Sequence, residues 1–249
     1  ATDQQLSEHS PYQVDQRQIV IVASTMRSGS TLLKALMATA PDISDLPEVN
    51  FQRLVDPNLT PRVWALAAQR IVLLKRPAWY HEIRTYPRIP ESLNPKLIVL
   101  VRDAWETVRS IRRMTFGILG ALVPRAFDRW LLLNYWLPIT ERLVRLADDQ
   151  PDCAKLVRYE DLVADPRQVT SQLFEFVGSR RHEGVDAYQF PKRGPWRWWS
   201  DDNSLHLQSL RVQKSRDETR PPVFFEQLLT TESRVVALRS RLGYSETSS

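Results

Sequence analysis

The sequence predicts an α/β protein in which helices cover both faces of a central, mostly parallel sheet. Three continuous apolar runs, rich in β-branched residues, are typical of strands buried on both faces: residues 18–23, 71–74 and 97–101. Helical patterns lie between and after these runs, which favours right-handed crossovers and a three-layer arrangement. The chain has 249 residues, of which 43% are hydrophobic, and this is enough apolar material for one sizeable core.

Further elements follow in order along the chain. A helix is expected from residue 32 to about residue 40, directly after the first strand. A long amphipathic segment covers 127–146, and a weaker fourth strand follows at 156–159. Strands that alternate with helices in this way predict a parallel sheet.

Capping residues define the ends of three helices. Asp165 and Pro166 are typical of an N-cap and a first helical position, and Gly178 is typical of the end of that helix. Thr60 and Pro61 open another helix in the same way. An apolar face followed by a glycine marks the last helix: Val235, Leu238, Leu242 and Gly243.

We interpret residues 1–249 as a single domain, because the sequence contains no repeat, low-complexity tract or obvious linker. A flexible N-terminal segment is expected over about 1–16, and a loop-rich acceptor or lid region over about 180–222. A tryptophan cluster in that second region either lines an acceptor pocket or packs a lid: Trp196, Trp198 and Trp199.

Composition excludes several classes of protein. Cys153 is the only cysteine, so no intrachain disulfide can form, and four scattered histidines argue against a Cys/His metal cluster. The polar first eighteen residues show no signal-peptide core, and charges interrupt the apolar stretch 116–137. We therefore expect a cytoplasmic protein without a membrane anchor. The net charge of +5 is mild, and it leaves a nucleic acid, a phosphate-bearing cofactor and plain solubility open.

The segment after the first strand is the strongest candidate for a ligand site. Ligands of parallel sheets bind beyond the carboxyl ends of the strands. Residues 24–31 (STMRSGST) form a turn with one glycine that leads into a helix. Free backbone amides and the helix dipole favour an anion at such a place, although an ordinary strand-to-helix turn with Ser/Thr capping has the same appearance.

This loop differs from the nucleotide-binding P-loop, G-x-x-x-x-G-K-[ST], in an informative way. Gly29 and Thr31 match the second glycine and the final hydroxyl, but Ser30 replaces the lysine and Ser24 the first glycine. The cation is Arg27, ahead of the glycine. The domain is therefore expected to be P-loop-like without being an ordinary NTPase.

The strand at 97–101 is followed by Arg102 instead of a carboxylate. The place where an NTPase would hold magnesium is thus positively charged, so the transferred group should need no metal. Sulfuryl transfer fits, because a sulfuryl group carries less charge than a phosphoryl group.

Three segments, in this order, resemble the sulfotransferases that use 3′-phosphoadenosine 5′-phosphosulfate (PAPS). Residues 27–33 (RSGSTLL) are similar to the family's 5′-phosphosulfate loop, and 101–110 (VRDAWETVRS) to its 3′-phosphate motif. Residues 157–166 (VRYEDLVADP) are similar to its third block, whose tyrosine lies near the adenosine. The resemblance implies a PAPS donor, a hydroxyl acceptor and a fold of the kind described above.

The resemblance also implies which residues bind the donor. Arg102 and Ser110 correspond to the pair that meets the 3′-phosphate. Alternatively, Arg102 forms a salt bridge with Asp103 or Glu106 and Ser110 is an exposed hydroxyl. Tyr159 is either an adenosine contact or a core residue with a satisfied hydroxyl. The loop residues implied for the phosphosulfate are Arg27, Ser28, Gly29, Ser30, Thr31 and Leu32.

A general base must accept the proton of the attacking hydroxyl. In cytosolic hormone-type members this base is a His two residues after a Lys, and here Pro77 occupies that position after Lys75. The pattern is closer to the tyrosylprotein and bacterial members that use a Glu, which implies Glu48 as the base. Lys75 and Arg27 are then the cations that stabilise the leaving phosphate. His81 is the alternative base.

A weak fourth similarity lies at 209–214 (SLRVQK), where the family closes a loop over the donor. It implies Ser209, Arg211 and Lys214 as further donor contacts, and each of the two cations could equally be a surface charge.

We therefore predict a sulfotransferase that moves a sulfuryl group from PAPS to the hydroxyl of a small-molecule acceptor, without a metal ion and without a nucleic-acid partner. An ATP-dependent small-molecule kinase of the P-loop type is the first alternative. A basic nucleic-acid-binding protein without catalytic activity is the second.

Overall fold

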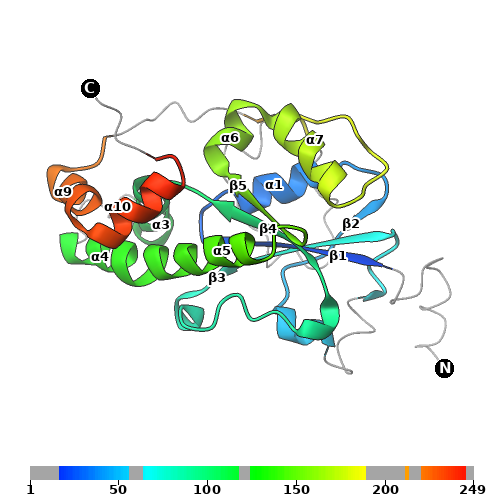
Figure 1. The fold of residues 1–249 in the computed structure, drawn as a ribbon, viewed down its shortest axis with the longest axis horizontal. Helices are drawn as coiled ribbons and strands as arrows, with labels where there is room; N and C mark the ends of the chain where they lie inside the picture. Colours follow the sequence, from blue (N-terminus) through cyan, green and yellow to red (C-terminus); the bar gives the residue numbers. More distant parts are fainter. Residues whose placement is uncertain (1–16, 56–63, 118–123, 189–210, 213–219, 245–249) are drawn as a thin grey trace.

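A computed structural model describes residues 17–55, 64–117, 124–188, 211–212 and 220–244 of the chain. These residues form a five-stranded sheet in the order β2-β3-β1-β4-β5, and every neighbouring pair of strands is parallel (Figure 1). The strands are β1 (Gln18–Thr25), β2 (Ile43–Asp45), β3 (Ile71–Ala78), β4 (Lys96–Val101) and β5 (Ala154–Arg158).

Helices connect the strands and cover the sheet. The α-helices are α1 (Ser30–Met37), α3 (Ala104–Phe116), α4 (Arg125–Trp130), α5 (Leu137–Asp149), α6 (Tyr159–Ala164), α7 (Pro166–Phe176), α9 (Val223–Thr231) and α10 (Ser233–Arg241). Between α4 and α5 the chain winds into a π-helical segment, Leu131–Trp136, which we call the π turn. Short 3₁₀ turns cover Phe51–Val55, Tyr80–Glu82 and Glu91–Leu93.

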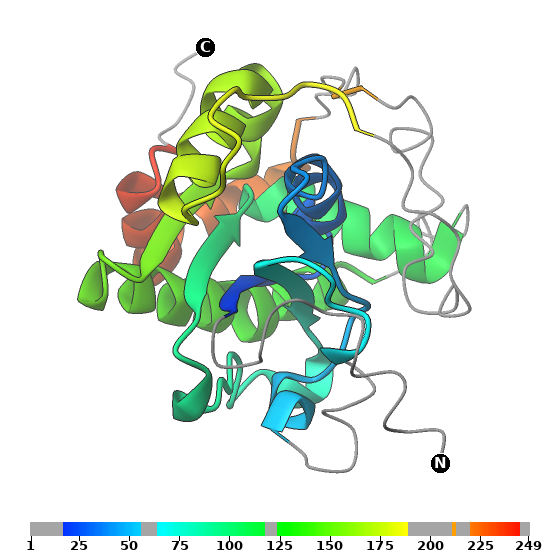
Figure 2. The same cartoon turned by 90° about the vertical axis from the view of Figure 1, so that its right-hand side faces the viewer.

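The sheet divides the core into two layers. Alternate residues of β1 point to opposite faces, so that Ile19, Ile21 and Ala23 belong to one apolar cluster and Val20 and Val22 to the other. Helices α3, α5, α9 and α10 cover the first face, and α1, α6 and α7 cover the second (Figures 1 and 2). This confirms the predicted three-layer α/β class.

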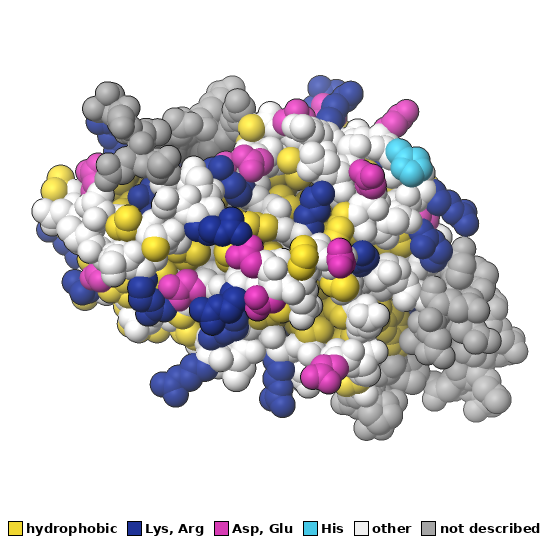
Figure 3. Space-filling model, in the orientation of Figure 1, with side chains coloured by type: hydrophobic (Ala, Val, Ile, Leu, Met, Phe, Trp, Pro, Cys, Tyr) yellow, Lys and Arg dark blue, Asp and Glu magenta, His cyan; other side chains and the backbone are white. Residues whose placement is uncertain are grey.

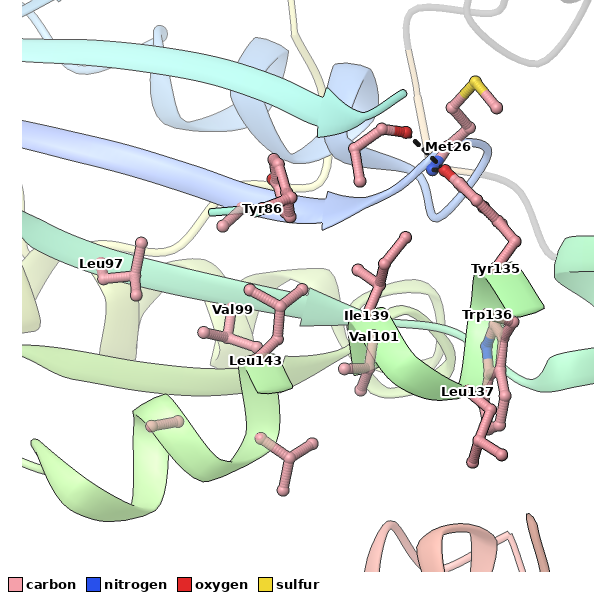
Figure 4. Close-up of a cluster of buried hydrophobic side chains, with 14 of the residues drawn as sticks. Met26, Tyr86, Leu97, Val99, Val101, Tyr135, Trp136, Leu137, Ile139 and Leu143 are labelled. Carbon is pink, nitrogen blue, oxygen red and sulfur yellow. Dashed lines mark hydrogen bonds between the residues drawn. The ribbon is translucent and has the colours of Figure 1, made fainter. Parts of the chain in front are cut away.

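The central strands were predicted because both of their faces are apolar. The runs at 18–23, 71–74 and 97–101 form β1, β3 and β4, with β1 and β3 extending further at their carboxyl ends. Figure 4 shows how Val99 and Val101 of β4 pack against Ile139 and Leu143 of α5. Strand β2 was not predicted, because it has only three residues, Ile-Ser-Asp, and lies at the edge of the sheet.

Each predicted helix is present where the structure describes it, but α1 begins at Ser30 and ends at Met37, whereas 32 to about 40 was expected. The amphipathic segment 127–146 is helical from α4 to α5, and α10 ends just before Leu242 and Gly243. The fourth strand ends at Arg158, one residue earlier than expected. The helix expected at Thr60 and Pro61 lies outside the described residues, as do the segment 1–16 and the three clustered tryptophans. Every described helix is too short or too polar to cross a membrane.

The N-cap of α7 provides a direct test of the local sequence signals. The Asp165 carboxylate accepts a hydrogen bond from the Gln168 amide at 3.0 Å. Replacing Asp165 with Ala should lower the free energy of unfolding by about 1 kcal/mol, because a helical amide loses its acceptor. Asp165→Asn keeps an acceptor and should cost less; equal losses in urea unfolding would contradict the capping role.

Candidate active site

The loop between β1 and α1 has the backbone shape of an anion site. Arg27 and Gly29 both adopt left-handed conformations, with φ of 62° and 89°. Gly29 is the N-cap of α1 and has no side chain to accept the helix's first amides. These amides and the positive end of the helix dipole therefore face the loop.

Tyr159 closes one side of this loop. A Cβ atom at Gly29 would lie only 2.3 Å from Cδ2 of Tyr159, so the ring occupies the space that any other residue's side chain would need. The Arg102 guanidinium lies over the same ring, 4.3 Å from its centroid. Tyr159 therefore lies between the loop and the end of β4, and it also packs against the second core cluster.

Three of the predicted phosphate-binding residues meet in this structure. The Arg27 Nε atom donates to the Ser110 hydroxyl at 3.1 Å, and an Arg102 guanidinium nitrogen donates to the Arg27 carbonyl at 3.0 Å. Arg102 also forms the expected salt bridge with Glu106, at 3.2 Å. The loop after β1 and the start of α3 after β4 thus form one cationic cluster.

A second cluster joins the loop to β3. Lys75 Nζ donates to the Thr31 hydroxyl at 2.8 Å and forms an ion pair with Glu48. The side chains of Lys75 and Glu48 are 6% and 13% exposed, so little water screens this pair. The predicted base and the predicted cation are therefore in direct contact, and Thr31 connects them to the anion loop.

Lys34 adds an ion pair that the sequence analysis did not single out. It is buried in α1, 2.5 Å from Asp45 Oδ1, and it donates to the carbonyl of Leu46. Burial lowers the pKa of Lys34, although the Asp45 carboxylate opposes this shift. This pair anchors the segment that carries Glu48 to the helix that follows the loop.

Two buried tyrosines, also missed from the sequence, fix the loop to β3. The Tyr86 hydroxyl accepts from the Ser24 amide at 2.9 Å and donates to the Arg76 carbonyl at 2.6 Å. The Tyr135 hydroxyl accepts from the Met26 amide at 2.7 Å and donates to the Ala78 carbonyl at 2.6 Å. Burial raises the pKa of both hydroxyls, so they remain protonated and able to donate. No local pattern marks these positions. Three of the four backbone partners are 57 to 109 residues away along the chain, and only the Arg76 carbonyl, 10 residues before Tyr86, is nearer.

The remaining loop residues take structural positions around the same turn. Ser28 is buried and shares a 2.6 Å hydrogen bond with Thr25, and Ser30 is buried at the start of α1. The Leu32 side chain packs against the second core cluster, so only its backbone amide can face an anion.

Other predicted residues lie at the edge of this arrangement or beyond it. The His81 side chain is 75% exposed, and its Nε2 atom lies 4.0 Å from Glu82. Arg211 pairs with Ala187 in an isolated antiparallel bridge. Ser209 and Lys214 lie outside the described residues. Among the described residues, no group of three or more His, Cys, Asp or Glu side chains could hold a metal ion.

The family to which this sequence can be matched agrees with the architecture described above. A sequence model described as "Sulfotransferase domain" matches residues 17–189, which is more than two thirds of the chain. The chain belongs to the sulfotransferase family. It is therefore a sulfotransferase enzyme, and family membership decides against the kinase and the nucleic-acid-binding alternatives. No curated protein sequence matches this sulfotransferase.

Solved structures share the fold at low sequence identity. A sulfotransferase domain from the Synechococcus PCC 7002 olefin synthase superimposes with a TM-score of 0.58 and 19% identity, covering 94% of this chain and 98% of that one. A sulfotransferase domain from the curacin biosynthetic pathway gives 0.56 and 18%, covering 91% and 98%. Mouse sulfotransferase SULT7A1, complexed with PAP, gives 0.54 and 12%, covering 98% and 95%.

The surface of this sulfotransferase shows how its charge is distributed on one face. On the face drawn in Figure 3, basic and acidic side chains are interspersed and do not gather into one basic area. The net charge of +5 thus gives this face no continuous track for a polyanion.

Gly29 supplies a test of the loop geometry. Gly29→Ala should lower the free energy of unfolding by about 2–5 kcal/mol, because it adds a clash with Tyr159 to the cost of a left-handed alanine. Gly178 is the matched control, since its φ is 69° and a Cβ there would meet no atom within 4 Å. Gly178→Ala should cost about 1–2 kcal/mol. Equal losses in denaturant unfolding would contradict the close contact between Tyr159 and the loop.

Proposed function

We propose that this sulfotransferase transfers a sulfuryl group from PAPS to a hydroxyl of a small-molecule acceptor, with Glu48 as the general base. The observation that carries this proposal is the joining of two clusters at one loop. Arg27, Arg102 and Ser110 meet on one side of residues 24–31, and Lys75 and Glu48 meet on the other. One end binds phosphate groups and the other contains a base beside a cation.

The described residues fit a donor that is anionic at two ends. The left-handed loop with its uncapped helix start suits the 5′-phosphosulfate, and Arg102 with Ser110 suits the 3′-phosphate. Arg27 contacts Ser110, so it lies between the two anionic groups of the proposed ligand. The mouse sulfotransferase of similar fold is complexed with PAP, which supports this choice of donor. Tyr159, beside Arg102, is the proposed adenosine-side contact, and Ser209, Arg211 and Lys214 remain predictions.

The proposed reaction is an in-line displacement at sulfur. The acceptor oxygen forms a bond to sulfur while the bond from sulfur to the bridging phosphate oxygen breaks, and the hydroxyl proton passes to Glu48. Lys75 and Arg27 stabilise the negative charge that develops on the departing phosphate. The ion pair with Lys75 holds the Glu48 carboxylate beside the loop, where it can accept this proton.

Metal independence is part of the same proposal. It rests on the cations that border the loop, Arg27, Lys75 and Arg102, since these can neutralise the phosphate oxygens themselves.

The acceptor is proposed to be a small molecule with an apolar or aromatic face. Trp79 and Tyr80 follow β3 directly and are 42% and 37% exposed, and the Tyr80 ring lies 5.8 Å from the ring of Trp130. Such exposed aromatic side chains, just beyond the strand that carries Lys75, would hold the apolar part of an acceptor. The single domain, the loop-rich acceptor region over about 180–222 and a cytoplasmic location stay predictions.

Binding of adenosine 3′,5′-bisphosphate tests the donor assignment. This nucleotide should raise the melting temperature of the wild-type protein, because a ligand that binds only the folded state stabilises it. Ser110→Ala should weaken its binding about five- to tenfold, and should weaken adenosine 5′-phosphate less, since that nucleotide lacks the 3′-phosphate.

Ser171→Ala is the control for this measurement, because it removes an exposed hydroxyl that donates to the His182 carbonyl. The absence of wild-type stabilisation at saturating nucleotide would contradict the PAPS donor. An equal loss for both nucleotides would contradict the role of Ser110.

Replacing the proposed base separates catalysis from binding. Glu48→Gln should reduce kcat by at least about 100-fold while leaving the affinity for adenosine 3′,5′-bisphosphate within about threefold, because the amide cannot accept the proton. The control is Glu82→Gln, which alters a similar pair with Arg76 on the same strand. Sulfuryl transfer is followed with labelled PAPS and a panel of phenols and alcohols. If Glu48→Gln retains turnover, another residue must be the general base, and His81 is the next candidate.

A further inference from the structure

The π turn lies across the carboxyl ends of three neighbouring strands. Tyr135 bridges the Met26 amide, just after β1, to the Ala78 carbonyl at the end of β3. The adjacent Trp136 donates its indole N–H to the Arg102 carbonyl, just after β4, at 3.1 Å. Since the sheet order is β3-β1-β4, two consecutive residues hold the ends of all three central strands. Figure 4 shows the Tyr135 side chain reaching the Met26 backbone while Trp136 lies beside it.

The π geometry explains how consecutive side chains can do this. In a regular α-helix, successive residues are separated by about 100° around the axis. Of three consecutive residues on a helix that covers a sheet, one therefore normally faces solvent. Here Tyr135, Trp136 and Leu137 are all at most 3% exposed. Single π turns inside α-helices are rare and frequent at functional sites. The extra residue turns both polar aromatic groups toward the strand ends.

Two of the three bonded backbone groups belong to a proposed phosphate ligand or to its neighbour. Met26 precedes Arg27, and the Arg102 carbonyl belongs to the residue whose guanidinium binds the Arg27 carbonyl. The Tyr135 hydroxyl acts on the 5′-phosphosulfate side and the Trp136 indole on the 3′-phosphate side. Both side chains are fully buried, and the two hydrogen bonds of Tyr135 are buried as well, whereas that of Trp136 is part-buried. Loss of either polar atom leaves its backbone partner without that hydrogen bond.

We propose that Tyr135 and Trp136 are positioning residues through which the π turn sets the geometry of the two phosphate subsites. This inference rests on the proposed PAPS donor. Tyr135 orients the loop after β1, and therefore affects any nucleotide with a 5′-phosphate. Trp136 orients Arg102, and therefore affects nucleotides with a 3′-phosphate more than nucleotides without one, which sense Arg102 only through its bond to the Arg27 carbonyl.

The test compares two nucleotides with two conservative variants by isothermal titration calorimetry. Tyr135→Phe should weaken adenosine 3′,5′-bisphosphate and adenosine 5′-phosphate alike, by about tenfold. Trp136→Phe should weaken the bisphosphate by about fivefold and weaken adenosine 5′-phosphate less. Thr170→Val is the control, because it also removes a buried hydroxyl that joins two backbone groups. The Thr170 hydroxyl accepts from the Val185 amide at 2.7 Å and donates to the Pro166 carbonyl at 2.6 Å. It should lower the melting temperature without changing either affinity.

The outcomes separate this inference from the donor assignment. If wild-type protein binds neither nucleotide, the proposed donor is wrong. If the wild type binds both, but Tyr135→Phe and Trp136→Phe lower only the melting temperature, as Thr170→Val does, then the π turn is merely structural and the inference is overturned. A loss in Trp136→Phe that is equal for both nucleotides overturns it as well. Should Tyr135→Phe not fold, the selectivity of Trp136→Phe still decides.

Discussion

The site depends on two buried tyrosine hydroxyls that join the backbones of β1 and β3 where these strands end. A parallel ladder leaves its last amides and carbonyls without partners in the sheet, and Pro77 lacks an amide altogether. Tyr86 and Tyr135 each accept from one strand and donate to the other. The chain can therefore leave the sheet at Met26 with its backbone satisfied, and enter the left-handed turn at Arg27 and Gly29.

Charge is arranged around this turn in pairs rather than as isolated ions. Lys75 and Lys34 are both buried, which is tolerable because each has a carboxylate within reach, Glu48 and Asp45 respectively. Arg102 is shared between Glu106, the Arg27 carbonyl and the ring of Tyr159. A bound anion would thus meet cations whose orientation is already fixed, and fixed cations stabilise a developing negative charge without reorganising.

Much of the architecture follows from local patterns. The runs 18–23, 71–74 and 97–101 are apolar on both faces, and only a sheet covered on both sides buries such strands. Asp165 and Pro166 start α7 as their capping chemistry requires. The roles of Lys75 and Glu48 came from resemblance to a family, but their ion pair was not foreseen. The contact of Arg27 with Ser110 was not foreseen either, because a spacing of 83 residues carries no local signal.

The sequence by itself determined the fold class, and it predicted an anion loop at 24–31 and three cations at strand ends, of which Lys75 lies within β3 in the structure. These depend on apolar periodicity and on residues close together in the chain, which local physical chemistry relates directly. Only the tertiary structure decided what orients the loop. Residues 127–146 are amphipathic over their whole length, yet a π turn within them directs Tyr135 and Trp136 to backbone groups of β1, β3 and the residue after β4. Such contacts form only when distant segments pack, so no local pattern can encode their partners.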